Sequence, residues 1–149
     1  MEQLSITLVP TAHETLILPS AIIAHIYPYA PPLLIDNASE FVIGGLLIGT
    51  DKLPLLDLFT TAAEQKDEDR NSFRVVLVSA VTTASPFIQY AILAHGQPQI
   101  ANIGENDITS LGKGSHRYIR RYVALAGYDS DKHLILPDLP ALEAELTMS

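Results

Sequence analysis

Short runs of aliphatic and β-branched residues recur along the whole chain, and Pro, Gly, Asn or Asp residues bound them. Such runs between turn signals are typical of β-strands. Few of them alternate between apolar and polar positions, and Val75–Val78 is apolar throughout, which indicates strands that are covered on both faces. Strands are predicted near Leu4–Val9, Thr15–Leu18, Ala21–Tyr27, Phe41–Ile48, Leu53–Phe59, Phe73–Val78, Phe87–Ala94, Gln99–Ile103, Tyr122–Gly127 and His133–Leu136.

Three segments depart from the strand pattern. Thr60–Ser72 is polar and acidic, which predicts a surface loop or a short frayed helix between two apolar halves. The stretch from Gly104 to about Arg121 is expected to be irregular. Pro140–Leu146 starts with proline and continues with good helix formers, so a short C-terminal helix is predicted.

Composition narrows the class of protein. A chain of 149 residues that is 48% hydrophobic suits one domain, or two small subdomains packed together. The chain has no cysteine, which excludes disulfide and thiolate chemistry and suits a reducing compartment. The formal net charge of −8 is opposite to what binding of nucleic-acid phosphates requires. We therefore expect no nucleic-acid partner.

The N-terminal residues Met1–Ser5 lack the pattern of a signal peptide. The stretch Leu16–Ile35 carries no Asp, Glu, Lys or Arg, but its prolines would break a membrane-spanning helix. We expect a soluble, cytoplasmic protein without membrane insertion.

No catalytic or metal-binding motif is present. The histidines lack the spacing of a helical metal pair, and the nucleophile pentad Gly-x-Ser-x-Gly is missing. Gly112–Ser115 does not follow the order of a phosphate-binding loop, and Gly44–Gly49 precedes a predicted strand rather than a helix. The carboxylates considered for acid–base work are Asp36, Glu40, Asp51 and Asp57. We expect no enzyme activity, metal or cofactor.

Two groups of side chains leave alternatives open. His25 and His95 lie in or at the ends of apolar strands, where they are either structural or line a barrel mouth that binds a small molecule. A basic cluster gathers four of the nine Lys and Arg residues within nine positions: Lys113, Arg117, Arg120 and Arg121. This cluster is either a solvated face or a docking patch for an acidic partner.

The stretch Phe41–Leu58 carries a resemblance to the CheW-like family. The family has a Gly-Val strand, an Asn-Leu-Arg-Gly turn and then Pro-Val-Ile-Asp-Leu. Gly44-Gly45, Leu47–Thr50 and Pro54–Leu58 occupy these places at the same spacing. Similar segments follow the family order from about Leu16 to Leu142: Ile23–Ile26 in place of Val-x-Glu-Ile, Tyr90–Gly96, Gln99–Ile103, Tyr122–Gly127, Leu134–Leu136 and Leu139–Leu142.

The chain departs from the family pattern at three positions. Gly49 stands in place of the turn arginine, His25 in place of the strand glutamate and His95 in place of the strand-end aspartate. Together with Pro28–Pro32 after the early strand, these departures make the chain resemble ChpC-type accessory proteins. Those proteins are CheW-like members of the chemosensory systems that control type IV pili and twitching motility.

The resemblance implies a fold and a function. The fold is all-β: a single CheW-like domain over residues 1–149, with two small five-stranded β-barrel subdomains divided near Thr60–Ser72 and a short C-terminal helix. The function is that of a non-catalytic adaptor, whose partners are a methyl-accepting chemoreceptor, a histidine kinase of the CheA type, or both. Two alternatives stay open: a small barrel that binds a small molecule, and a structural subunit that forms homo-oligomers.

The resemblance also implies where a protein partner binds. Receptor contacts in the family lie in a groove between the barrels, which points to Ile23, Gly44 and Gly49 here, with Leu47 and Ile48 as neighbours. Gly44 and Gly45 either keep the strand surface low for a partner or only relieve strand curvature.

Overall fold

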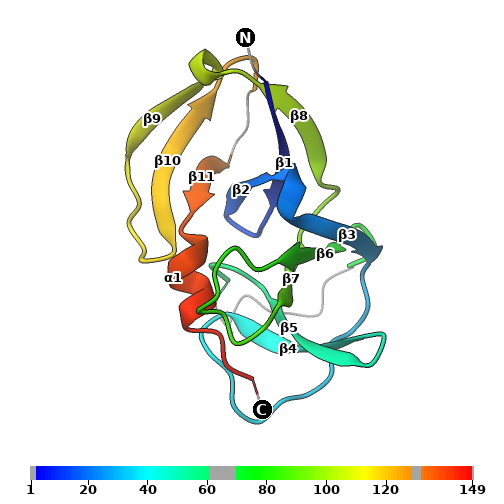
Figure 1. Cartoon of the computed structure of the whole chain (residues 1–149). Helices are drawn as coiled ribbons and strands as arrows, with labels where there is room; N and C mark the ends of the chain where they lie inside the picture. The colour runs from blue at the N-terminus through cyan, green and yellow to red at the C-terminus, as the bar shows by residue number, and fades with distance from the viewer. Residues whose placement is uncertain (1–2, 61–69, 129–131, 149) are drawn as a thin grey trace.

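A computed structural model describes residues 3–60, 70–128 and 132–148. The described residues form strands joined by loops, with two short 3-10 turns and one short α-helix near the C-terminus (Figure 1). The elements in order are β1 (Leu4–Pro10), β2 (Glu14–Pro19), η1 (Ser20–Ile22), β3 (Ile23–Pro28), β4 (Val42–Ile48), β5 (Asp51–Leu56), β6 (Arg74–Ser79), β7 (Gln89–Ala94), β8 (Gln99–Ile103), η3 (Glu105–Asp107), β9 (Ile108–Lys113), β10 (Ile119–Leu125), β11 (His133–Pro137) and α1 (Leu139–Ala144). Within these ranges no helix has the length and apolar character needed to cross a membrane.

Two sheets divide the strands between them. Sheet A has six strands in the order β8-β1-β2-β11-β10-β9, and sheet B has five in the order β3-β6-β7-β5-β4. Figure 1 shows sheet A above, sheet B below and α1 beside the place where they meet. The predicted all-β class with two strand-built subdomains and a C-terminal helix is confirmed.

Sheet A has one strand more than expected. The additional strand is β9, which lies in the stretch that was expected to be irregular. Its residues are mostly polar and exposed, so no apolar run marks them. Pairing with β10 defines this strand, in a register that runs from Ile108 opposite Leu125 to Lys113 opposite Arg121.

The predicted division near Thr60–Ser72 is wrong. All strands from β3 to β7 belong to sheet B, so this segment lies between two strands of one sheet, β5 and β6. Sheet A instead joins both ends of the chain, because β2 pairs in parallel with β11 and β1 pairs with β8. The predicted acidic surface loop falls largely on residues 61–69, which lie outside the described residues.

Three apolar clusters form the core. The largest lies between the sheets and takes residues from both, including Leu16 and Ile135 from sheet A and Val76 from sheet B. A second cluster belongs to sheet A and a third to sheet B. On β6, Val75 joins the third cluster and Val76 the first, so both faces of the strand are covered, as the unbroken apolar run predicts.

A buried carboxylate attaches α1 to sheet B. The Asp138 side chain accepts a hydrogen bond from the Ala141 N–H at 3.1 Å and so caps the helix. Glu143, in the same helix, is fully buried and accepts hydrogen bonds from the backbone N–H of Val81 and from the Tyr90 hydroxyl, at 2.9 and 2.7 Å. Burial and the hydrogen bond to Glu143 raise the pKa of Tyr90 well above its ordinary range.

Candidate protein-binding groove

A groove lies between the two edge strands of sheet B. Because β3 and β4 stand at opposite edges of the strand order, each has one side without a neighbouring strand. The groove has a volume of about 450 Å³. Its lining residues carry no charge: Tyr27, Pro28, Tyr29 and Ala30 on the β3 side, Leu46, Leu47, Ile48 and Gly49 on the β4 side, and Val75.

The β4 wall follows from alternation along the strand. Successive side chains of a strand point to opposite faces. Leu46 is therefore buried in the sheet B cluster, whereas the side chain of Leu47 is 62% exposed. An exposed leucine beside an uncharged groove provides apolar surface for another protein.

The β4–β5 hairpin needs a glycine at its turn. Ile48 pairs with Asp51, which leaves Gly49 and Thr50 as a two-residue connection. Gly49 has a φ of +63° and occupies the first central position, which is the pattern of a type II′ turn. A side chain at Gly49 would therefore be strained by the backbone, although no atom lies within 4 Å of its added Cβ.

We expect Gly49→Ala to lower the free energy of unfolding by about 1–2 kcal/mol, because an L-residue in the left-handed region loses roughly that much. Denaturant unfolding of both proteins measures the loss. Thr50→Ala is the matched control, since it truncates the neighbouring turn residue, which has no positive φ. An unfolding midpoint equal to that of the unchanged protein would contradict the prediction.

The structure brings together three of the five predicted binding residues. Leu47, Ile48 and Gly49 all line the groove. Ile23 instead begins β3, pairs with Val78 and packs against the central cluster. That these five residues bind a partner stays a prediction.

Gly44 is covered by the chain itself. It is buried, and a Cβ added to it would lie 2.5 Å from the Cβ of Pro32 and 2.7 Å from the carbonyl oxygen of Leu33. The next residue, Gly45, forms two backbone hydrogen bonds with Leu33. The close approach expected at this pair of glycines is therefore made by residues 32–33 of the same chain.

Sequence reasoning missed the other wall of the groove. Tyr27 and Tyr29 are two positions apart, and both pack against the sheet B cluster. The proline-rich stretch Pro28–Pro32 marks the point where the chain leaves the ladder, because proline cannot donate a backbone hydrogen bond. That stretch was the available signal for this wall.

His25 and His95 do not line one barrel mouth, contrary to one of the alternatives. His25 lies opposite Leu77 on β6, and Leu77 lies opposite Ala91 on β7. His95 comes four residues after Ala91, a distance of roughly 13 Å along a strand. The exposed ring of His25 contacts Tyr27 instead, with 4.3 Å between ring centroids.

His95 forms part of a mostly buried polar cluster. Its Nε2 lies 2.7 Å from Oδ1 of Asp57, and the Asp57 side chain is 2% exposed. The hydroxyl of Thr60 donates to the same carboxylate oxygen at 2.9 Å. The His95 ring also packs on Phe73. Among the four carboxylates considered for acid–base work, Asp57 is thus bound to a histidine, and Glu40 contacts His116 and Arg117.

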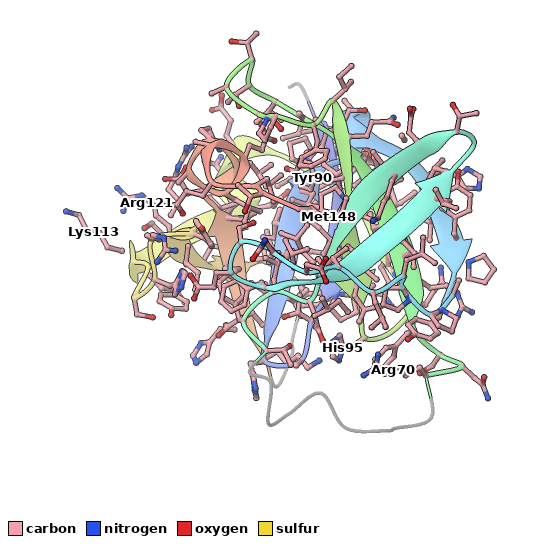
Figure 2. All side chains as sticks on the ribbon, turned by 90° about the horizontal axis from the view of Figure 1, so that it is seen from below. Arg70, Tyr90, His95, Lys113, Arg121 and Met148 are labelled. Carbon is pink, nitrogen blue, oxygen red and sulfur yellow. The ribbon has the colours of Figure 1, made fainter. Side chains whose placement is uncertain are left out.

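Two arginines of the basic cluster form ion pairs with carboxylates of the same molecule. Arg117 contacts Glu40 at 2.7 Å and Glu145 at 2.9 Å, and Arg120 lies 3.6 Å from Asp138. Hydrogen bonds from the Tyr118 hydroxyl and Arg117 lower the pKa of Glu145. In Figure 2 only Lys113 and Arg121 of this cluster are labelled, and both extend away from the molecule beside β9 and β10. The arginines of this cluster therefore do not all face an outside partner.

No group of three or more His, Asp or Glu side chains within the described residues is arranged to hold a metal ion. The candidate site is therefore the uncharged groove beside β4.

Neither a family model nor a curated protein sequence matches this chain. Among solved structures, the chain is similar to the scaffolding protein TtCheW from Thermoanaerobacter tengcongensis, with a TM-score of 0.69. The likeness covers 93% of this chain and 86% of that chain at 15% sequence identity.

The fold is CheW-like. The likeness spans both sheets, since it covers nearly the whole chain. At this level of identity it shows the CheW-like fold alone and assigns no role to a single residue. The assignment of the groove as a candidate binding site therefore depends on its geometry and on the resemblance in sequence.

Proposed function

We propose that the protein is a non-catalytic, CheW-like adaptor that links chemoreceptors to a histidine kinase of the CheA type. The observation that carries this proposal is the combination of a CheW-like fold over nearly the whole chain with an uncharged groove beside an exposed leucine. The resemblance in sequence points to the same strand, because Leu47–Thr50 occupies the place of the family turn.

The physical basis for binding is the desolvation of the groove. Tyr27, Tyr29 and Ile48 offer aromatic and aliphatic surface, and the exposed Leu47 adds to it. Burying such surface against a partner is favourable at about 25 cal/mol per Å² of apolar area. An aspartate at Leu47 would remove this apolar surface and would lose hydration when a partner covers it, a cost that Lys52, opposite Leu47 in the register, offsets only in part.

Leu47→Asp should weaken binding of a chemoreceptor signalling tip or of a kinase regulatory domain at least tenfold, about 1.4 kcal/mol. Calorimetric titration of the purified protein with each partner measures the affinity. The matched control is Leu111→Asp, because Leu111 is also a strand leucine, is 63% exposed and lies on β9 in the other sheet. Equal affinities for the two variants would remove the groove from the site, and binding of neither partner by the unchanged protein would end the adaptor proposal.

The finer proposal is that the adaptor serves a chemosensory system that controls type IV pili and twitching motility. It rests on the ChpC-like features of the sequence, namely Gly49, His25, His95 and the Pro28–Pro32 stretch. Affinity purification from pilus-bearing cells tests it. Recovery of a receptor or kinase of the pilus system supports the proposal. Recovery of the chain alone favours a structural homo-oligomer instead.

A further inference from the structure

On the edge of β4 that faces away from β5, one residue of the same chain, Leu33, already pairs with Gly45 as a neighbouring strand would. The Leu33 N–H donates to the Gly45 carbonyl oxygen at 2.7 Å, and the Gly45 N–H donates to the Leu33 carbonyl oxygen at 3.0 Å. Both backbone groups of Gly45 therefore point away from β5. The opposite residue in the register is Pro54, which has no N–H to donate, as a non-hydrogen-bonded pair permits.

The same alternation fixes the direction of the backbone at Leu47. In an antiparallel ladder, hydrogen-bonded and non-hydrogen-bonded pairs alternate, and the register from Gly45 to Ile48 has no bulge. Leu46 therefore exchanges hydrogen bonds with Leu53 of β5, whereas the N–H and C=O of Leu47 point outward as those of Gly45 do. Neither group of Leu47 has a hydrogen-bond partner among the described residues.

The space beside Leu47 is the groove. The antiparallel bridge between Leu33 and Gly45 has no counterpart opposite Leu47 among the described residues, and residues 46–49 form one wall of the open volume of about 450 Å³. A strand lies about 4.8 Å from its neighbour in a sheet. An occupant at that distance from β4 would have Leu47 as its next pairing position. Tyr27 and Tyr29 line the same groove from the β3 side.

A cation near the groove favours an acidic residue at one end of a bound peptide. Arg74 lies opposite Pro28, which lines the groove. Its guanidinium donates to the carbonyl oxygens of Asn71 and Phe73, and no carboxylate within the described ranges contacts it. A carboxylate on the occupant near Pro28 would complement this cation.

We infer that β4 binds an extended, mainly apolar peptide segment of a partner protein by strand addition at Leu47, with an acidic residue of that segment near Arg74. Main-chain hydrogen bonds to Leu47 fix the register of the bound segment. The groove accepts every second side chain of that segment, as in other strand-addition complexes. This inference rests on the proposed adaptor function, because it names the kind of segment that a partner presents.

The test compares two substitutions of one residue. Leu47→Pro removes the outward N–H, whereas Leu47→Ala keeps it and truncates the side chain. Because the Leu47 N–H is not used in pairing with β5, proline at this edge position should leave the unfolding midpoint close to that of the alanine variant. The probe is a set of terminally blocked hexapeptides of alternating valine and threonine with an aspartate at either end. Their binding is followed by amide chemical shifts in NMR.

The expected result is saturable binding of a hexapeptide at millimolar concentration, with the largest shifts at Leu46–Ile48. Leu47→Pro should then bind about tenfold more weakly than Leu47→Ala, in line with the loss of one hydrogen bond and the unpaired acceptor that it leaves. Equal affinity of the two variants overturns the inference, as does an absence of saturable shifts.

A second measurement does not depend on the folding of the proline variant. The same hexapeptides, methylated on alternate backbone nitrogens, lose the donors of one edge. The unchanged protein should bind them about tenfold more weakly when the methylated edge is the one that faces Leu47. Failure of the adaptor proposal is distinguishable, because hexapeptide binding is measured without receptor or kinase. If receptor and kinase bind Leu47→Pro and Leu47→Ala equally well, the adaptor stands and the strand addition is excluded.

Discussion

Replacing Glu143 by alanine is expected to lower the free energy of unfolding by about 3–5 kcal/mol. The carboxylate is fully buried and accepts hydrogen bonds from four donors: the backbone N–H groups of Val81 and Thr82, both at 2.9 Å, and the hydroxyls of Thr82 and Tyr90, at 2.8 and 2.7 Å. Alanine would leave the buried Tyr90 hydroxyl and the part-buried donors of Val81 and Thr82 without their acceptor. Each unsatisfied buried group costs about 1–3 kcal/mol.

Denaturant unfolding followed by circular dichroism measures this loss. Glu145→Ala is the control in the same helix region, because Glu145 is an exposed carboxylate whose ion pair with Arg117 lies at the surface. Such a pair contributes about 0–1 kcal/mol, and the lost hydrogen bond from the Tyr118 hydroxyl to the same carboxylate adds about 1 kcal/mol. Tyr90→Phe removes a single donor and should cost less than Glu143→Ala. Similar midpoints for Glu143→Ala and Glu145→Ala would show that Glu143 does not secure α1 to sheet B.

The second large effect is expected at Gly44. Gly44→Ala should destabilise the protein by about 3 kcal/mol, at the upper end of what overpacking costs in a core. The new methyl group would lie 2.5 Å from the Pro32 side chain and 2.7 Å from the Leu33 carbonyl oxygen. Relief requires a shift of backbone at residues 32–33, which the hydrogen bonds between Leu33 and Gly45 oppose.

Gly45→Ala is the matched control for this position. Its Cβ would lie 2.8 Å from Cε of Lys52, the mobile end of an exposed side chain that can move aside. The two neighbouring glycines should therefore differ by about 2 kcal/mol in thermal or denaturant unfolding. A midpoint for Gly44→Ala that matches Gly45→Ala contradicts this packing argument.

A larger substitution at Gly44 also bears on the binding site. Gly44→Leu carries a larger version of the same clash, so we expect it to lose binding together with stability. If Gly44→Leu instead keeps its unfolding midpoint and loses only partner affinity, Gly44 lies in the partner site despite its cover by Pro32. This outcome would favour the family-based assignment over the packing role.

The groove illustrates how far the sequence led toward the candidate site. The family-like order of residues pointed to Leu47, Ile48 and Gly49, and these residues line the groove. The same reasoning included Gly44, because a glycine in a strand indicates close approach without saying which chain approaches. Here residues 32–33 of the same chain make that approach.

Local pattern by itself determined most of the secondary structure. Unbroken aliphatic runs predicted the strands of both sheets, and proline followed by helix formers predicted α1, because backbone propensity and burial act over a few neighbouring residues. The absence of charge along Val75–Val78 also predicted burial on both faces. These features depend on no distant contact.

Only the tertiary structure decided which strands share a sheet. The strand β9 has no apolar run and exists through its pairing with β10. The ends of the chain meet because β2 pairs with β11, which no composition shift at residues 60–72 could indicate. The outward backbone of Leu47 likewise follows from the register between β4 and β5 and from the contact with Leu33. Pairing across long sequence separation is a property of the whole fold, so a site built between two edge strands appears only once both edges are placed.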